Sequence, residues 1–124
     1  MKTGVFVFIE AIDFTSAVRH YFGDEVAYAE FQNELVADPE RGGVIPGASP
    51  LRKVRWFDKR RGLGKRGGLR IIYIHIPEIQ VLFLMDVYGK DEAEDLSAKD
   101  KKILRELSRE LVEGLKERYA RGKL

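Results

Sequence analysis

The apolar positions in the first third of the chain follow two spacings, and each spacing predicts one type of element. A short run rich in β-branched and aromatic residues predicts a first strand over Val5–Ile9. Apolar residues then recur at helical spacing in two segments. The first helix is expected between an Asp13 cap and Gly23, and the second between an Asp24 cap and Asp38, which precedes a proline and so disfavours further helix.

The remaining elements are separated by glycine and proline. Pro39–Pro50 is dense in both and predicts a loop, with Val44 and Ile45 as its anchors to the core. Three consecutive strands are expected next, with antiparallel pairing: Leu51–Phe57, Leu69–Ile76 and Ile79–Tyr88, the last two joined by a tight Pro77-Glu78 turn. Ser97 caps a final amphipathic helix.

Alternation along the strands assigns side chains to faces. Lys53 and Arg55 share one face of their strand, and Arg52, Val54 and Trp56 share the other. In the last strand the odd positions from Ile79 to Val87 are expected to form the core. The even positions become polar toward the end, so Asp86, Tyr88 and Lys90 are expected to border the same surface as Lys53, Arg55 and Arg70.

This order of strand, two helices, three antiparallel strands and helix predicts an α+β fold. At 124 residues and 44% hydrophobic content, the chain fits one domain over residues 1–124. The absence of cysteine excludes disulfides and thiolate chemistry and fits a reducing cytoplasmic setting. No signal peptide and no membrane span are predicted, so a soluble protein is expected.

Charge is distributed unevenly. The formal net charge is only +2, but residues 51–75 carry nine Lys or Arg against one Asp or Glu. Such a cluster in a small domain is typical of a surface that binds nucleic-acid phosphate, and RNA is the expected partner. The alternative is that the cations merely protect an exposed strand edge from aggregation, but nine cations exceed what that requires.

Between the second and third strands, glycines alternate with cations in a segment that resembles a phosphate grip. It does not match a Walker A loop, because neither Ser nor Thr follows Lys65. Nucleotide hydrolysis is therefore not predicted. The residues expected to bind RNA are Arg52, Lys59, Arg60, Arg61, Lys65 and Arg66.

Other residues whose side chains could take part in chemistry fit structural roles better. His75 alternates with isoleucines, a pattern that favours a structural histidine with its hydrogen bonds formed. His20 lies near a helix C-terminus, where the helix dipole favours it. Tyr28 and Tyr73 lie in apolar runs, and Trp56 is likewise assigned a structural role. No metal site and no cofactor are predicted.

The segments GVIPG, LRKVRW, GKRGGLRIIY, VYGK and DLS, taken in this order, resemble the RelE/HigB superfamily of bacterial toxins, and the HigB2-like branch most closely. The resemblance spans nearly the whole chain and implies a RelE-like fold. It also implies an endoribonuclease of a type II toxin-antitoxin system that cuts messenger RNA on the ribosome, without a metal, until a cognate antitoxin neutralises it.

The same resemblance implies which residues are catalytic. Lys53 and Arg55 match two basic residues on the second strand of RelE-type toxins, Arg70 matches the arginine that opens the third, and Tyr88 and Lys90 match the family's Tyr-Gly-Lys ending. In this chemistry a 2′-hydroxyl attacks the adjacent phosphate. The arginines suit phosphate clamping, Lys53 is the expected proton acceptor, and Tyr88 or Lys90 is the expected donor.

The sequence departs from RelE itself at two places. Asp91 stands where an arginine follows the glycine-lysine pair, and Leu96 or Ser97 occupies the place of a C-terminal tyrosine. Two other interpretations stay open. One is a ParE-like toxin that binds DNA gyrase without cleaving anything, and the other is a noncatalytic RNA-binding domain.

Overall fold

A computed structural model describes residues 6–58, 68–92 and 96–124 of the chain. Its elements follow one another as β1 (Val7–Glu10), α1 (Ile12–Phe22), α2 (Glu25–Ala37), β2 (Gly43–Val44), β3 (Arg52–Trp56), β4 (Leu69–Ile76), the 3₁₀ turn η2 (Pro77–Ile79), β5 (Val81–Gly89) and α3 (Ala98–Ala120). The fold is α+β, as expected. No helix in the described ranges combines the length and the apolar character that crossing a membrane requires.

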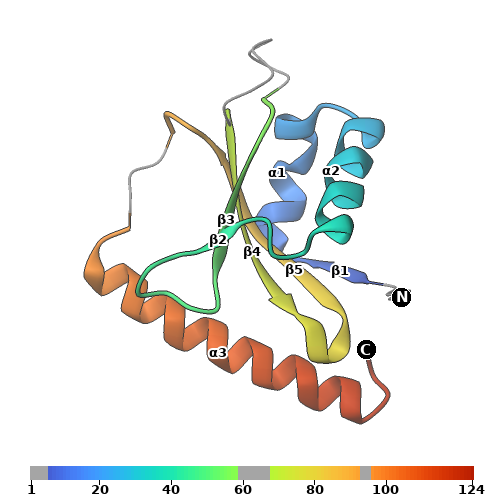
Figure 1. The fold of residues 1–124 in the computed structure, drawn as a ribbon, viewed down its shortest axis with the longest axis vertical. Coiled ribbons are helices and arrows are strands. Elements are labelled where there is room, and N and C mark those ends of the chain that lie inside the picture. Colours follow the sequence, from blue (N-terminus) through green and yellow to red (C-terminus); the bar gives the residue numbers. More distant parts are fainter. Residues whose placement is uncertain (1–5, 59–67, 93–95) are drawn as a thin grey trace.

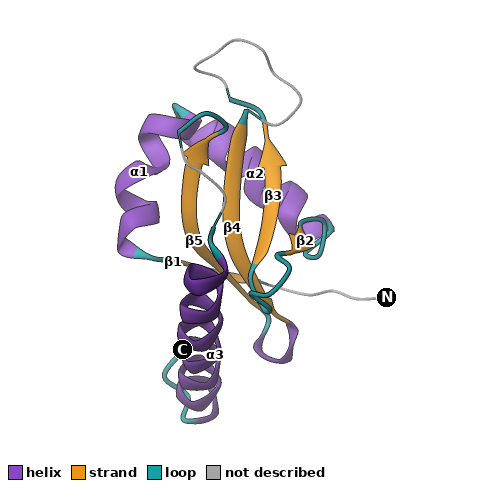
Figure 2. Cartoon of the chain, turned by 90° about the vertical axis from the view of Figure 1, so that its left-hand side faces the viewer, coloured by secondary structure: helices purple, strands orange, loops and turns teal. Residues whose placement is uncertain are grey.

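The strands form one mixed sheet in the order β1-β5-β4-β3-β2. The three central strands pair antiparallel, as predicted, whereas β1 pairs parallel to β5 at the edge. Helices α1 and α2 lie against one face, and α3 lies on the opposite side near one end of the strands (Figure 1). Seen from that opposite side, the far ends of β3, β4 and β5 are not crossed by a helix (Figure 2).

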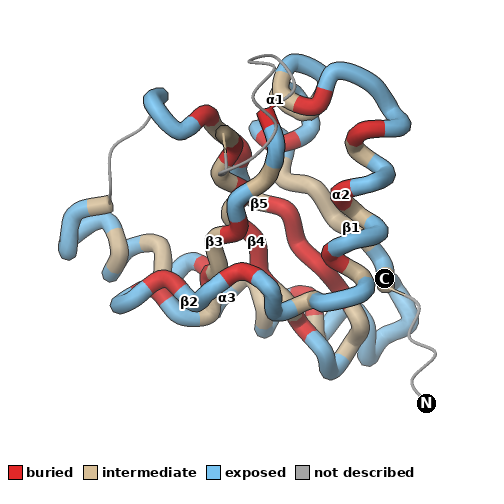
Figure 3. The backbone as a smooth tube through the Cα atoms, turned by 45° about the horizontal axis from the view of Figure 1, so that its top comes forward, coloured by how far each residue is buried: buried red, intermediate tan, exposed pale blue. Residues whose placement is uncertain are grey.

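Both faces of the sheet are apolar over part of their area. The odd positions Val81, Phe83 and Val87 of β5 are buried, as expected, but the even positions Leu82 and Leu84 are buried as well. Leu82 and Leu84 pack with α1 and α2, whereas Val81 and Phe83 belong to a second cluster with α3. Buried positions therefore recur along β4 and β5 on both faces, whereas only Val54 of β3 is buried (Figure 3). The reason is that helices cover both faces, so neither set of alternating side chains can be polar there.

A β-bulge at Met85 changes the alternation of β5. Ile72 pairs with Asp86 while the next residue, Tyr73, pairs with Leu84, so Met85 has no partner on β4. After the bulge Val87 joins Leu84 on the side of α1 and α2. Asp86 and Tyr88 consequently point to the other side, as residues beyond one inserted position must.

The helix termini match the sequence in two of three cases. The side chains of Asp24 and Ser97 accept hydrogen bonds from the Ala27 and Asp100 amides, which confirms both caps. The Asp13 cap is wrong, because α1 already begins at Ile12, directly after Ala11 and with no side-chain cap. There the chain leaves β1 directly into the helix, and the Ala11 amide donates to the Leu84 carbonyl.

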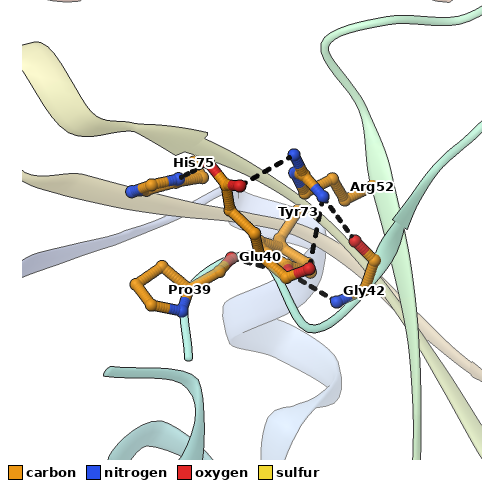
Figure 4. A network of polar contacts seen from close by, with 6 residues as sticks. All are labelled: Pro39, Glu40, Gly42, Arg52, Tyr73 and His75. Atoms are coloured by element: carbon orange, nitrogen blue, oxygen red, sulfur yellow. Dashed lines mark hydrogen bonds and ion pairs between the residues drawn. The ribbon is translucent and has the colours of Figure 1, made fainter. Parts of the chain in front are cut away.

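The loop before β3 also differs from the prediction. Gly43 and Val44 pair with β3 as a short strand, and Val44 is exposed while Ile45 is buried. Tyr73 holds the loop from the side of α1 and α2, since its hydroxyl donates to the Pro39 carbonyl at 2.8 Å and accepts from the Gly42 amide at 3.0 Å (Figure 4). Burial raises the pKa of this tyrosine, which keeps the hydroxyl protonated and able to donate.

The Tyr73→Phe variant tests this attachment. Removing the hydroxyl leaves a carbonyl and an amide of the loop without their partner, so the free energy of unfolding should fall by about 1–3 kcal/mol. Urea denaturation followed by circular dichroism measures the change. Tyr119→Phe is the matched control because Tyr119 is exposed on α3, and its effect should stay within about 0.5 kcal/mol. An equal, small effect at both positions would contradict the assigned role of Tyr73.

Candidate functional site

Cationic and polar side chains form two adjacent rows across the central strands, on the face away from α1 and α2. In the first row Arg55 lies opposite Arg70, and Arg70 lies opposite Tyr88. In the second row Lys53 lies opposite Ile72, and Ile72 lies opposite Asp86. Directly paired side chains share a face and adjacent strands lie about 4.8 Å apart, so each row spans roughly 10 Å. That span suits a phosphodiester and its neighbouring sugars.

Apart from Arg70, the residues of these rows line a pocket of about 760 Å³, hereafter the sheet pocket, which lies within the size range of ligand sites. Its other walls come from the start of α1, the loop after β2 and the first turns of α3. Its polar lining residues are Asp13, Lys53, Arg55, Asp86, Tyr88 and Lys101, and its apolar ones include Ile45, Leu51, Ile72, Met85, Leu96 and Leu104.

The start of α1 is fixed beside the bulge in β5. Glu10, the last residue of β1, accepts hydrogen bonds from Thr15 at 2.6 Å and Tyr28 at 2.5 Å. Together with the amide of Ala11 on Leu84, these contacts fix the first turn of the helix against β5. Asp13 in that turn therefore reaches the sheet pocket instead of capping the helix.

The opposite wall is held by turns and by α3. Ile45 donates its amide to the Leu51 carbonyl, and Leu51 donates its own amide to the Ala48 carbonyl, so the segment before β3 closes on itself. Gly47 adopts a φ of 81°, a conformation that favours glycine, and its carbonyl accepts from the Arg105 side chain at 3.4 Å. The wall is thereby attached both to the sheet and to α3.

The cations of the rows are placed at an electrostatic cost. Arg55 stands directly opposite Arg70, and like charges in that position destabilise a sheet. Within the described part of the chain, neither Lys53 nor Arg55 forms an ion pair. The one acid of residues 51–75, Asp58, is buried. An anion bound over the rows would relieve the repulsion between the guanidinium groups.

Asp86 is the acidic member of the second row. Its Oδ1 accepts a hydrogen bond from the Val87 amide at 2.9 Å. Although the residue reaches solvent, the pocket walls partly desolvate the carboxyl, and this raises its pKa above the ordinary aspartate value. The Val87 amide opposes the rise in pKa, and the charge of Asp13 adds to it.

The structure brings together four of the five residues expected to be catalytic: Lys53, Arg55, Arg70 and Tyr88 occupy the two rows. Lys90 follows as an exposed residue just beyond β5, where its amide donates to the Gly68 carbonyl at 2.8 Å. Its side chain is not part of the pocket lining. The surface predicted to join the last strand to the basic strands therefore exists for Asp86 and Tyr88.

Of the residues expected to bind RNA, the structure describes Arg52 alone. Arg52 points to the other face, where it donates to the Gly42 carbonyl at 2.7 Å and pairs with Glu40 at 3.7 Å (Figure 4). His75 also contacts Glu40, at 3.2 Å, in agreement with its expected structural role. The expected RNA contacts of Lys59, Arg60, Arg61, Lys65 and Arg66 fall outside the described residues.

Sequence patterns missed Asp13 and Lys101 as pocket residues. Both lie near helix starts whose position depends on tertiary contacts, so alternation within a single element gives no signal for them. No protein-family model matches the chain.

The pH dependence of stability tests the environment of Asp86. A raised pKa means that the folded state favours the protonated carboxyl, so the stability contributed by this group is present at low pH and is lost as pH rises through the folded-state pKa. The Asp86→Asn variant lacks this loss. The melting temperature of this variant should therefore increase relative to that of the wild type as pH rises from the acidic range to neutrality. Thermal scans across that range measure the difference. If the melting temperature of the variant instead fell relative to that of the wild type over this range, the folded state would stabilise the carboxylate form of Asp86.

Proposed function

We propose that the protein is a ribosome-dependent mRNA endoribonuclease, the toxin of a toxin-antitoxin pair. The observation that supports this best is the pair of adjacent rows on the uncovered end of the sheet. Lys53, Arg55 and Tyr88 line one pocket, and Arg70 lies between Arg55 and Tyr88 in the first row. These are the residues that the resemblance to RelE/HigB toxins assigns to catalysis, and they come from three separate strands.

The proposed reaction is metal-independent transfer of a phosphodiester to the neighbouring 2′-hydroxyl. Arg55 and Arg70 lie opposite each other on two adjacent strands. On one face of the sheet they present planar, permanently charged donors, which suits a pentacoordinate phosphorane. Tyr88 at the end of the first row supplies a proton-bearing hydroxyl for the leaving 5′-oxygen. The product would be a cyclic phosphate and a free 5′-hydroxyl.

The biological setting follows from the same proposal. The fold would be RelE-like, with a parallel β1 added at the sheet edge, and the protein would act in the cytoplasm. Messenger RNA in the ribosomal decoding site would be the substrate, so the ribosome would supply part of the positioning that a pocket with few acid-base groups lacks. A cognate antitoxin would cover or distort the sheet pocket and block cleavage.

The direct test is a reconstituted translation system with a defined message. Added wild-type protein should produce cuts within codons in the decoding site, mapped by primer extension. Lys53→Ala and Arg70→Ala should each lower the cutting rate by at least about 100-fold, because each removes a charge that contacts the reacting phosphate. Arg109→Ala is the matched control, since it removes an exposed cation on α3 outside the pocket.

Two other outcomes would identify the rival functions. An intact message combined with inhibited DNA supercoiling by gyrase would favour a ParE-like toxin. Stalled translation with an intact message and protein bound to RNA would favour a noncatalytic binding domain. Loss of cutting in the Arg109→Ala control would show that general charge, and not the pocket, carries the effect.

A further inference from the structure

We infer that Asp86 is the general base of the phosphate transfer and takes the proton directly from the attacking 2′-hydroxyl. This inference rests on the proposed function. It replaces Lys53 as the expected proton acceptor and leaves Lys53 as a cation that binds the phosphate. The resemblance to RelE/HigB toxins assigns no role to Asp86.

The first support is the way in which β5 delivers this side chain. Without the unpaired Met85, regular alternation would put Asp86 on the same face as Leu84, among the side chains packed under α1 and α2. The bulge instead turns the carboxyl into the sheet pocket, next to the row that contains Tyr88. Bulges commonly redirect a side chain beside an active site in this way.

The second support is the chemistry of the two candidate bases. Lys53 shares its pocket with Arg55 and Lys101. An unperturbed lysine has a pKa of about 10.4 and must lose its proton before it can accept one. An unperturbed aspartate has a pKa of about 3.9, so it is already ionised at neutral pH and can accept a proton. Within the sheet pocket, Asp86 and Asp13 are the only carboxylates among the described lining residues.

The third support is the hydrogen bonding of the carboxyl group. Oδ1 is oriented by the Val87 amide, and no hydrogen bond to Oδ2 is formed by any other described residue. One oxygen thus fixes the group while the other can accept a proton from substrate. Asp13 is a positioning residue in this arrangement, since its negative charge makes Asp86 a stronger base.

The step balances without any further reactant. The 2′-O–H bond breaks and its proton passes to Oδ2 of Asp86, while the oxygen's electron pair forms a bond to phosphorus. The bond from phosphorus to the 5′-oxygen then breaks, and that oxygen takes the proton of the Tyr88 hydroxyl. Arg55, Arg70 and Lys53 neutralise the charge that develops on the nonbridging oxygens.

A 5′-bridging phosphorothiolate in the message separates a base from an acid. A thiolate leaves without a proton, so this substrate restores cutting when the general acid is lost but not when the base is lost. Single-turnover cutting is measured on ribosomes programmed with the oxygen or the sulfur substrate. Tyr88→Phe should be slow on oxygen and fast on sulfur. Asp86→Asn should be slower than wild type by about 100-fold or more on both, the usual range for a lost acid-base group.

Controls separate chemistry from folding and binding. Asp86→Asn should keep the wild-type circular dichroism spectrum and ribosome affinity, and Asp86→Glu, which retains a carboxylate, should recover part of the rate. Glu106→Gln makes the same acid-to-amide change on an exposed part of α3 and should cut like wild type. Asp13→Asn should shift the acidic limb of the rate profile to lower pH, because it removes a charge that adds to the effect of desolvation on the pKa of Asp86.

The possible failures are distinct. Rescue of Asp86→Asn by the sulfur substrate would make Asp86 an acid and overturn the inference, as would wild-type cutting by this variant. A misfolded Asp86→Asn protein would also overturn it, because the carboxyl would then be structural. If the wild type itself cuts neither substrate, the proposed function fails, and the role of Asp86 fails with it.

Discussion

The inserted residue Met85 in β5 is the constraint on which the arrangement of this protein depends. The strand must bury leucines under α1 and α2 in its first half, yet present polar groups on the opposite face in its second half. A regular strand cannot do both with this sequence, because its alternation never changes. One unpaired residue resolves the conflict, and the break in the ladder lies at the boundary between the packed and the open parts of the sheet.

The same boundary organises the neighbouring elements. The parallel pairing of β1 ends opposite Leu84, and α1 begins immediately afterwards, with the amide of the preceding Ala11 bonded to the Leu84 carbonyl. On the other side of the sheet, α3 covers the half before the bulge through Leu115 and its neighbours. The pocket thus occupies the space that neither helical layer fills. Its floor is formed by β4 and β5, which contribute residues to both cores.

Sequence patterns predicted the element order, the antiparallel centre and the convergence of Lys53, Arg55 and Arg70 with Tyr88, because period-two alternation is a local property. They failed at Met85, since a bulge depends on what packs on both faces. They failed at Asp13 for a related reason: an acid near a helix start resembles a cap, and only the contacts of Glu10 and Ala11 show that the helix starts earlier. The short β2 was missed because two paired residues leave no pattern.

The like charges of Arg55 and Arg70, which lie opposite each other on β3 and β4, have an evolutionary consequence. Repulsion across that pair disfavours the folded sheet, because two like charges lie directly opposite each other. Most substitutions that relieve it would make the molecule more robust to heat while removing what the pocket can bind. A population of variants selected only for thermal stability would therefore lose binding at the pocket. The substitutions that it accumulated would cluster at the pocket residues on the sheet surface.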